Sequence, residues 1–156
     1  MKRILIVDDD EQIRNLLVDY FQYLSYEALF AADGAEALGK LSQNDIDCII
    51  SDLVMPDMNG LELLKQVRSQ NNKIPFLIIT GYPTIETAIE VMKQGAYDYI
   101  AKPLQLDDVR IKVERALHTK TLERSIKRLT GIAWAIIISI PIWLLLGIFF
   151  GKVWRY

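Results

Sequence analysis

Polar side chains that could do chemistry follow four short apolar segments of this chain. They are the carboxylates of Asp8 and Asp9 after ILIV, the carboxylate of Asp52 after CIIS, the hydroxyl of Thr80 after FLII and the ammonium of Lys102 after YIA. Clustered carboxylates repel one another unless a cation binds or one of them takes up a proton. Brought together, these groups could hold a hard divalent cation such as Mg²⁺ and transfer a phosphoryl group to an aspartate.

The apolar segments alternate along the chain with segments of helical periodicity. The predicted strands cover residues 4–7, 28–31, 48–50, 76–79 and 99–101. The predicted helices cover residues 11–24, 35–41, 61–68, 85–94 and 106 onward. Short apolar strands, each followed by a helix, predict a doubly wound α/β fold with a parallel sheet covered on both faces. Ligands bind such sheets at the carboxyl ends of the strands, where the polar side chains above would converge.

Each polar residue also has a simpler structural interpretation. Acids after a strand often cap the following helix, and we assign that role to Asp10. Capping would explain Asp8 as well as a functional role does. A threonine at a strand end is often structural, and Lys102–Pro103 could be an ordinary loop. The occurrence of all these residues at strand ends of one chain favours a site.

The charge of the chain is strongly segregated. Residues 1–111 carry eighteen acids against ten bases, whereas residues 112–130 carry six bases against two acids. An acidic body argues against nucleic acid as a partner, because binding phosphates requires positive potential. Cys48, in an apolar segment, is predicted to be a small core residue of a protein in a reducing compartment. His118 is predicted to lie on the surface.

Residues 132–150 contain no charge and predict a membrane-spanning helix. Nineteen helical residues span about 29 Å, close to the thickness of the bilayer core. The predicted boundaries are a span at 131–151 and a short non-cytoplasmic tail at 152–156. The span residues singled out are Ile132, Trp134, Pro141, Trp143 and Phe150.

Residues 121–130 are predicted to form a basic helical connector next to this span. Its bases suit the anionic lipids of the cytoplasmic leaflet and, by the positive-inside rule, keep the N-terminal domain in the cytoplasm. Leu122, Ile126 and Leu129 recur at helical spacing. This stripe is consistent with a short dimeric coiled coil or with a solvated spacer that rests on lipid headgroups.

Four segments together resemble the receiver domain of two-component response regulators. They are ILIVDDDEQIR, SDLVMPDMNGLELL, FLIITGYPTIETAIEVMKQGAYDYIAKP and the helix at 106–117, and the resemblance covers about residues 2–120. We therefore expect a receiver domain at 1–120, with the flavodoxin-like strand order 2-1-3-4-5 and an extended fifth helix. The resemblance is strongest to receivers of the nitrogen-regulation type, which normally precede an ATPase module. We expect neither an ATPase nor a DNA-binding output domain here.

The resemblance implies specific roles for the polar residues. Asp52 matches the phosphoacceptor. Asp8 and Asp9 match the acidic pair that holds Mg²⁺, or Mn²⁺ in its place, together with Asp52 and the backbone carbonyl of Val54. Lys102 matches the lysine that stabilises the phosphoryl group.

The same resemblance implies a switch. Thr80 matches the hydroxyl that contacts the phosphoryl group and moves, and Tyr99 matches the aromatic residue that turns with it. The Lys102–Pro103 bond is expected to be cis. Leu104 departs from the family, where an aromatic residue commonly follows Lys-Pro.

These observations predict a membrane-tethered receiver at the bacterial inner membrane, rather than an enzyme, apart from self-catalysed phosphoryl transfer and autodephosphorylation. The expected partners are a histidine kinase or other phosphodonor, membrane lipids, and a second copy bound through the face of helix four, strand five and helix five and through the connector.

Two alternatives remain open at this point. A phosphohydrolase of the haloacid dehalogenase type could use Asp8 as nucleophile, but it leaves Asp52 unexplained and expects a Thr or Val where Gln12 stands. A structural membrane adaptor with a silent receiver fold has no physical need for the costly charge cluster.

Overall fold

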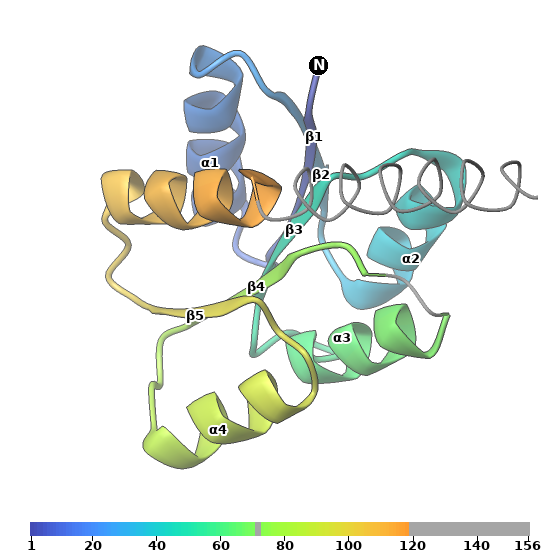
Figure 1. The fold of residues 1–156 in the computed structure, drawn as a ribbon, viewed down its shortest axis with the longest axis vertical. Coiled ribbons are helices and arrows are strands. Elements are labelled where there is room, and N and C mark those ends of the chain that lie inside the picture. Colours follow the sequence, from blue (N-terminus) through green and yellow to red (C-terminus); the bar gives the residue numbers. More distant parts are fainter. Residues whose placement is uncertain (71–72, 119–156) are drawn as a thin grey trace, which may run out of the picture. The chain divides into compact units, whose positions relative to one another are not determined.

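A central sheet of five parallel strands organises this protein, for which a computed structural model describes residues 1–70 and 73–118 (Figure 1). The strands are β1 (Arg3–Val7), β2 (Glu27–Ala31), β3 (Cys48–Asp52), β4 (Phe76–Thr80) and β5 (Asp98–Ala101). Their order in the sheet is β2-β1-β3-β4-β5, and all four pairings are parallel. The predicted parallel sheet and its strand order are confirmed.

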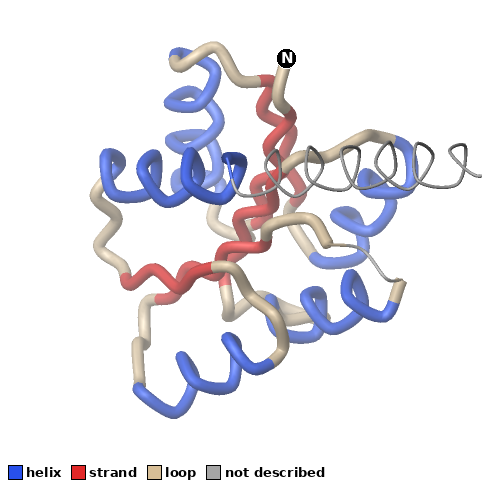
Figure 2. The backbone as a smooth tube through the Cα atoms, viewed as in Figure 1, coloured by secondary structure: helices blue, strands red, loops and turns tan. Residues whose placement is uncertain are grey.

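Helices cover both faces of the sheet (Figures 1 and 2). They are α1 (Glu11–Tyr23), α2 (Gly34–Gln43), α3 (Gly60–Ser69), α4 (Ile85–Lys93) and a helix at residues 106–118, where the described part ends. Leu17 and Phe21 of α1 pack with Val109 and Val113 in one apolar cluster. A second cluster, on the other face, takes side chains from α2, α3 and α4. The fold is therefore the doubly wound α/β architecture expected from the alternating pattern.

Two strands extend further than their apolar residues indicate. Strand β3 continues through Ser51 to Asp52, and β4 continues to Thr80. Their last residues still pair, Asp52 with Ile79 and Thr80 with Ala101. The pairing of the main chain, rather than side-chain hydrophobicity, determines where these strands end. This pairing places the carboxylate of Asp52 and the hydroxyl of Thr80 at the carboxyl end of the sheet.

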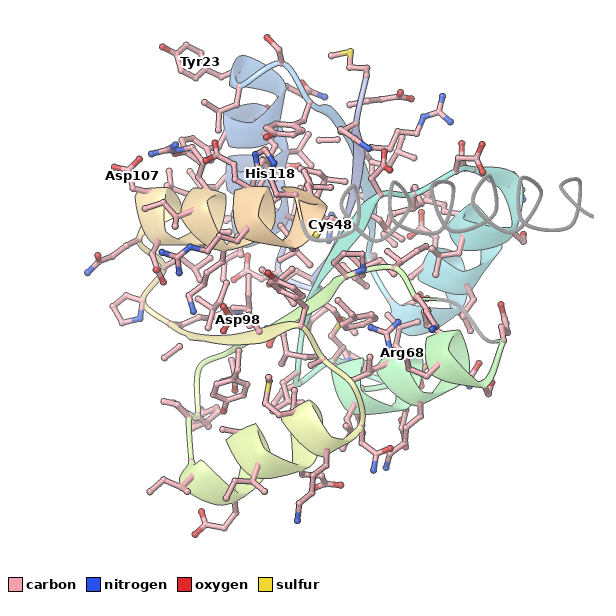
Figure 3. The ribbon with its side chains drawn as sticks, in the orientation of Figure 1. Tyr23, Cys48, Arg68, Asp98, Asp107 and His118 are labelled. Carbon is pink, nitrogen blue, oxygen red and sulfur yellow. The ribbon has the colours of Figure 1, made fainter. Side chains whose placement is uncertain are left out.

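Several predictions about single residues are confirmed. Cys48 is buried and lies between the sheet and the helix at 106–118, whereas His118 is exposed (Figure 3). Asp10 caps α1, because its carboxylate accepts hydrogen bonds from the backbone amides of Gln12 and Ile13. Leu104, the departure from the family pattern, packs partly buried against the same cluster as Cys48.

Gly60 is required where the chain turns back from β3 into α3. A Cβ atom at this position would lie 2.1 Å from the carbonyl oxygen of Asp52. The Gly60 amide donates to the carbonyl of Leu53, and the capping box of Asn59 and Glu62 begins the helix. The close approach of Gly60 holds the main chain that carries Asp52.

The predicted tail falls outside the described residues. The chain divides into two units, Met1–His118 and Thr119–Tyr156. Within residues 1–70 and 73–118, no helix has both the length and the apolar character needed to cross a membrane. The connector at 121–130, the span at 131–151 and the tail at 152–156 are not among these residues. The same holds for the span residues singled out above, Ile132, Trp134, Pro141, Trp143 and Phe150.

Replacing Gly60 by alanine should lower the free energy of unfolding by about 3 kcal/mol, because the new methyl group has no space beside a backbone carbonyl. Gly39→Ala is the matched control, since a Cβ atom there meets nothing within 4 Å. That variant should gain about 0.5–1 kcal/mol from the better helix propensity of alanine. Urea unfolding followed by circular dichroism measures both changes. Equal effects of the two variants would contradict the close approach at Gly60.

Candidate functional site

Three carboxylates meet at the carboxyl end of the sheet. Asp8 directly follows β1, and Asp52 is the last residue of the adjacent strand β3, where Val7 pairs with Ser51. Asp8 is 1% exposed and Asp52 7%, whereas Asp9 is exposed. Oxygen atoms from Asp8, Asp9 and Asp52 all lie within 4.8 Å of one another. The structure thus brings together the three acids that the sequence singled out.

Lys102 supplies the opposite charge. Its ammonium lies 2.6 Å from Oδ2 of Asp52 and 3.3 Å from Oδ2 of Asp8. The backbone amide of Lys102 donates to the carbonyl of Thr80, and the following bond to Pro103 is cis, as expected. The hydrogen bond to Thr80 ties the chain just after β5 to β4, and the lysine side chain reaches Asp8 after β1 and Asp52 in β3.

The pKa values reflect this mixture of burial and charge. Burial raises the pKa of Asp8 above its ordinary value, and the amide of Asp10 and the charge of Lys102 only partly offset this. Burial alone would lower the pKa of Lys102, but its hydrogen bond to Asp52 and the charges of Asp8 and Asp52 raise it. The site therefore keeps a firmly charged lysine beside a carboxylate whose ionisation is costly.

Backbone amides orient the two buried carboxylates. Oδ1 of Asp8 accepts a hydrogen bond of 2.9 Å from the amide of Asp10. Oδ1 of Asp52 accepts one of 3.2 Å from the amide of Val54, whose side chain is exposed. Each carboxylate is thus held by an amide at one oxygen and by Lys102 at the other.

The two predicted switch residues lie on neighbouring strands. Thr80, at the end of β4, is fully buried, and its Oγ1 accepts a hydrogen bond from the amide of Tyr82. Tyr99, in β5, lies with its hydroxyl 3.1 Å from Oγ1 of Thr87 in α4. Thr87 also belongs to the capping box that begins α4 at Thr84. Thr80 therefore lies beside the acids, whereas Tyr99 connects to the first turn of α4.

The donor set fits a hard divalent cation. Carboxylate oxygens are the ligands that Mg²⁺ prefers, and it is commonly held by one or two carboxylates together with water and phosphate oxygens. Asp9 is exposed and can approach such a cation from solvent, and Asp8 and Asp52 border the same space. A bound cation would also offset the cost of burying the ionised Asp8 carboxylate, which is the main cause of its raised pKa.

Sequence reasoning missed two residues, one that contacts the acid cluster and one that contacts the predicted switch residue Tyr99. Arg14, near the start of α1, donates from Nη1 to the carbonyl of Asp8. A cation near a helix N-terminus opposes the helix dipole, and this local mismatch was the signal that could have drawn attention to it. Thr87, the partner of Tyr99, gave no comparable signal, because threonine is common at the start of helices.

The site lies within a region that matches known proteins. The family profile described as "Response regulator receiver domain" matches residues 4–114. The Regulatory protein AtoC of Escherichia coli is 36% identical over 129 residues, which cover 83% of this chain and 28% of that protein. A Putative response regulator NtrX-like of Rickettsia bellii is 36% identical over 123 residues, covering 78% and 26%. The chain thus matches less than a third of the length of these curated relatives.

Solved structures agree with this match. NtrX from Brucella abortus is similar with a TM-score of 0.77 and 32% identity, over 83% of this chain and 30% of that one. The Vibrio cholerae chemotaxis protein CheY4 is similar with a TM-score of 0.72 and 37% identity, over 75% of this chain and 99% of that one. The matches support a signalling family rather than the phosphohydrolase alternative built on Asp8.

Asp8→Asn should raise the thermal unfolding midpoint by a few degrees at pH 7 without divalent cations, because it removes a desolvated charge. Since the pKa of Asp8 is raised in the fold, its ionisation reduces stability as pH rises above its ordinary value, about 4. The gain should therefore shrink as the pH falls toward that value. Asp9→Asn, at an exposed position, is the control and should change the midpoint less. A destabilised Asp8→Asn at pH 7 would contradict this account.

Proposed function

Because this chain belongs to the response regulator receiver family, we propose that it is a signalling switch that accepts a phosphoryl group on Asp52. The observation that carries the proposal is the position of Asp52, buried at the end of β3 with Lys102 at 2.6 Å and two further carboxylates beside it. Transfer to a carboxylate depends mainly on positioning and on neutralising charge, and this arrangement provides both.

The transfer follows from the groups in place. A carboxylate oxygen of Asp52 attacks the phosphorus of a phosphohistidine on the donor, a P–O bond forms, and the P–N bond breaks. The imidazole nitrogen keeps the electron pair and takes up a proton. In the later hydrolysis, a water oxygen attacks the phosphorus and the P–O bond to Asp52 breaks, which releases inorganic phosphate and restores the carboxylate. Lys102, already beside Oδ2 of Asp52, then pairs with the charge of the phosphoryl group.

A divalent cation completes this proposal. Asp8, Asp9, Asp52 and the carbonyl of Val54 would hold Mg²⁺, or Mn²⁺ in its place. The ion would neutralise charge on the phosphoryl oxygens. The convergence of Asp8, Asp9 and Asp52, with oxygen atoms within 4.8 Å of one another, supports this part of the proposal.

The switch would run from the site to α4. The Thr80 hydroxyl can turn from its present contact with the Tyr82 amide toward a phosphoryl oxygen. The loop before α4 would follow it, and Tyr99 would exchange its contact with Thr87 for an inward position. This is a shift between two populated states, driven by contacts that exist only with the phosphoryl group present.

The partners follow from the same scheme. A histidine kinase is the proposed donor. The face made by α4, β5 and the helix at 106–118 is the proposed surface for dimerisation or for a downstream partner. Exposed apolar side chains on α4 support an interface there, namely Ile85, Ile89 and Met92.

Membrane tethering is the remaining part of the proposal. The charge-free segment at 132–150 and the bases before it support a single-pass anchor in the bacterial inner membrane, with the receiver domain in the cytoplasm. The connector would then contact anionic lipids, and an output at the membrane would use the face on α4.

Incubation with Mg²⁺ and a small phosphodonor such as acetyl phosphate should add one phosphoryl group to the protein, measured by intact-mass spectrometry. Asp52→Asn should abolish this gain, because an amide is not a competent acceptor. Asp57→Asn is the matched control, since Asp57 is exposed and has a φ of 61°, which asparagine tolerates. That variant should be phosphorylated normally. Wild-type protein that gains no phosphoryl group would instead favour the silent adaptor.

We expect the wild-type protein to remain in the membrane fraction after carbonate extraction. Replacing both Ile138 and Ile142 by lysine should release the protein into the soluble fraction. Each lysine at the centre of a span costs about 2.5–3.5 kcal/mol of insertion free energy. We expect the cost of two lysines to exceed the favourable insertion free energy of the remaining apolar residues. Leu122→Lys, in the connector, is the control and should stay in the membrane fraction. An unmodified chain found entirely in the soluble fraction would contradict the anchor.

A further inference from the structure

One cation close to the acid cluster contacts the main chain instead of a carboxylate. Nη1 of Arg14 donates to the carbonyl of Asp8 at 2.8 Å and lies 3.5 Å from the carbonyl of Asp9. Arg14 stands near the N-terminus of α1, where the helix dipole disfavours a positive charge. The contact with two consecutive carbonyls is the gain that can offset this cost.

The side chain of Arg14 is held in place by an aromatic ring. Its guanidinium carbon lies 5.7 Å from the centroid of Phe30 in β2, and the ammonium of Lys40 lies 4.5 Å from the same centroid. Lys40 also donates to the carbonyl of Phe30 and pairs with Glu36 at 2.8 Å. Phe30 is 47% exposed, and its ring contacts both cations. Cation–π contacts of this kind orient a guanidinium.

The Nε atom of Arg14 shows that this orientation has a cost. It is buried and has no hydrogen-bond partner among the residues that the structure describes. A buried unpaired donor is unfavourable, so the geometry is maintained by the contacts of Nη1 and by the Phe30 ring. The side chain is thus aimed at the segment after β1 rather than placed for its own hydrogen bonding.

We propose that Arg14 is a positioning residue for the acid cluster, because its guanidinium holds the backbone carbonyls of Asp8 and Asp9. Three consecutive aspartates, Asp8 to Asp10, repel one another and would tend to spread the segment after β1. A cation on the carbonyl side restrains the segment and leaves the carboxylate oxygens free for a divalent ion. The inference rests on the proposed function, in which those oxygens hold Mg²⁺.

Two physical effects of Arg14 oppose each other, and this makes the inference testable. Its positive charge alone would repel a divalent cation, so its removal would tighten binding, more so at low salt. Its positioning role predicts the reverse. Loss of an outer-shell partner that orients metal ligands typically weakens metal binding about 10–100-fold.

Titration calorimetry of Mg²⁺ into the purified full-length chain, at low and at moderate salt, separates these effects. Arg14→Met should weaken binding at least about 10-fold at both salt concentrations. Arg14→Lys keeps the charge but offers one ammonium instead of a planar fork, so it should fall between that variant and the wild type. Phe30→Leu, which leaves Arg14 in place but removes its support, should also weaken binding. Lys65→Met removes an exposed positive charge on α3 and is the matched control, with unchanged affinity.

Unfolding midpoints measured with a chelator present establish whether each variant is folded. If Arg14→Met is not folded, the test uses Arg14→Lys or Phe30→Leu instead. Unchanged or tighter Mg²⁺ binding in the folded Arg14 variants would overturn the inference. Failure of the proposed function is distinct, because it appears as a wild-type chain that gains no phosphoryl group. In the phosphorylation reaction, the concentration of Mg²⁺ needed for half-maximal rate should rise in Arg14→Met more than the maximal rate falls.

Discussion

The ammonium of Lys102, placed between Asp8 and Asp52, is the interaction on which the rest of this site depends. Parallel pairing of β1, β3, β4 and β5 brings the carboxyl ends of four strands to one edge, which concentrates polar side chains in a small space. Two of the carboxylates are almost fully buried there, and the ammonium of Lys102 forms an ion pair with both. The backbone bond from Lys102 to Thr80 ties this charge to β4, so the architecture of the sheet and the electrostatics of the site are inseparable.

The single positive charge of Lys102 does not neutralise all three carboxylates of Asp8, Asp9 and Asp52. Lys102 pairs with Asp8 and Asp52 of the three carboxylates, and burial still keeps the pKa of Asp8 above its ordinary value. Such a cluster gains stability when a divalent cation or a phosphoryl-linked ion pair is added, and this gain is the driving force of the proposed switch. Thr80 contacts the amide of Tyr82 in the loop before α4, and Tyr99 contacts Thr87 in the first turn of α4. In the proposed switch, a change of charge at Asp52 would bias the position of α4, whose apolar residues Ile85, Ile89 and Met92 are exposed.

The sequence was sufficient to predict the elements and the acid cluster, and the reasons are physical. Each strand is a short apolar segment bounded by polar residues, and each helix has a clear periodicity. The sequence therefore predicted that these strands and helices exist, but not the residues at which they end. Strand β3 ends at Asp52 because its main chain pairs with β4, and no hydrophobic pattern encodes that pairing. The strand order came from the resemblance of the motifs to receivers, since alternation alone permits other orders. The contacts of Arg14 and Thr87 depend on the relative placement of α1, α4 and the sheet, which local sequence does not specify.

The most direct test of the central claim is to identify the acceptor atom by chemical trapping. The phosphorylated chain would be reduced with borohydride, which converts an aspartyl phosphate to homoserine, and the modified residue located by peptide mass spectrometry. The account predicts homoserine at position 52 and nowhere else. Homoserine at position 8, or no conversion in a chain that carries phosphate, would show that the site works by another chemistry.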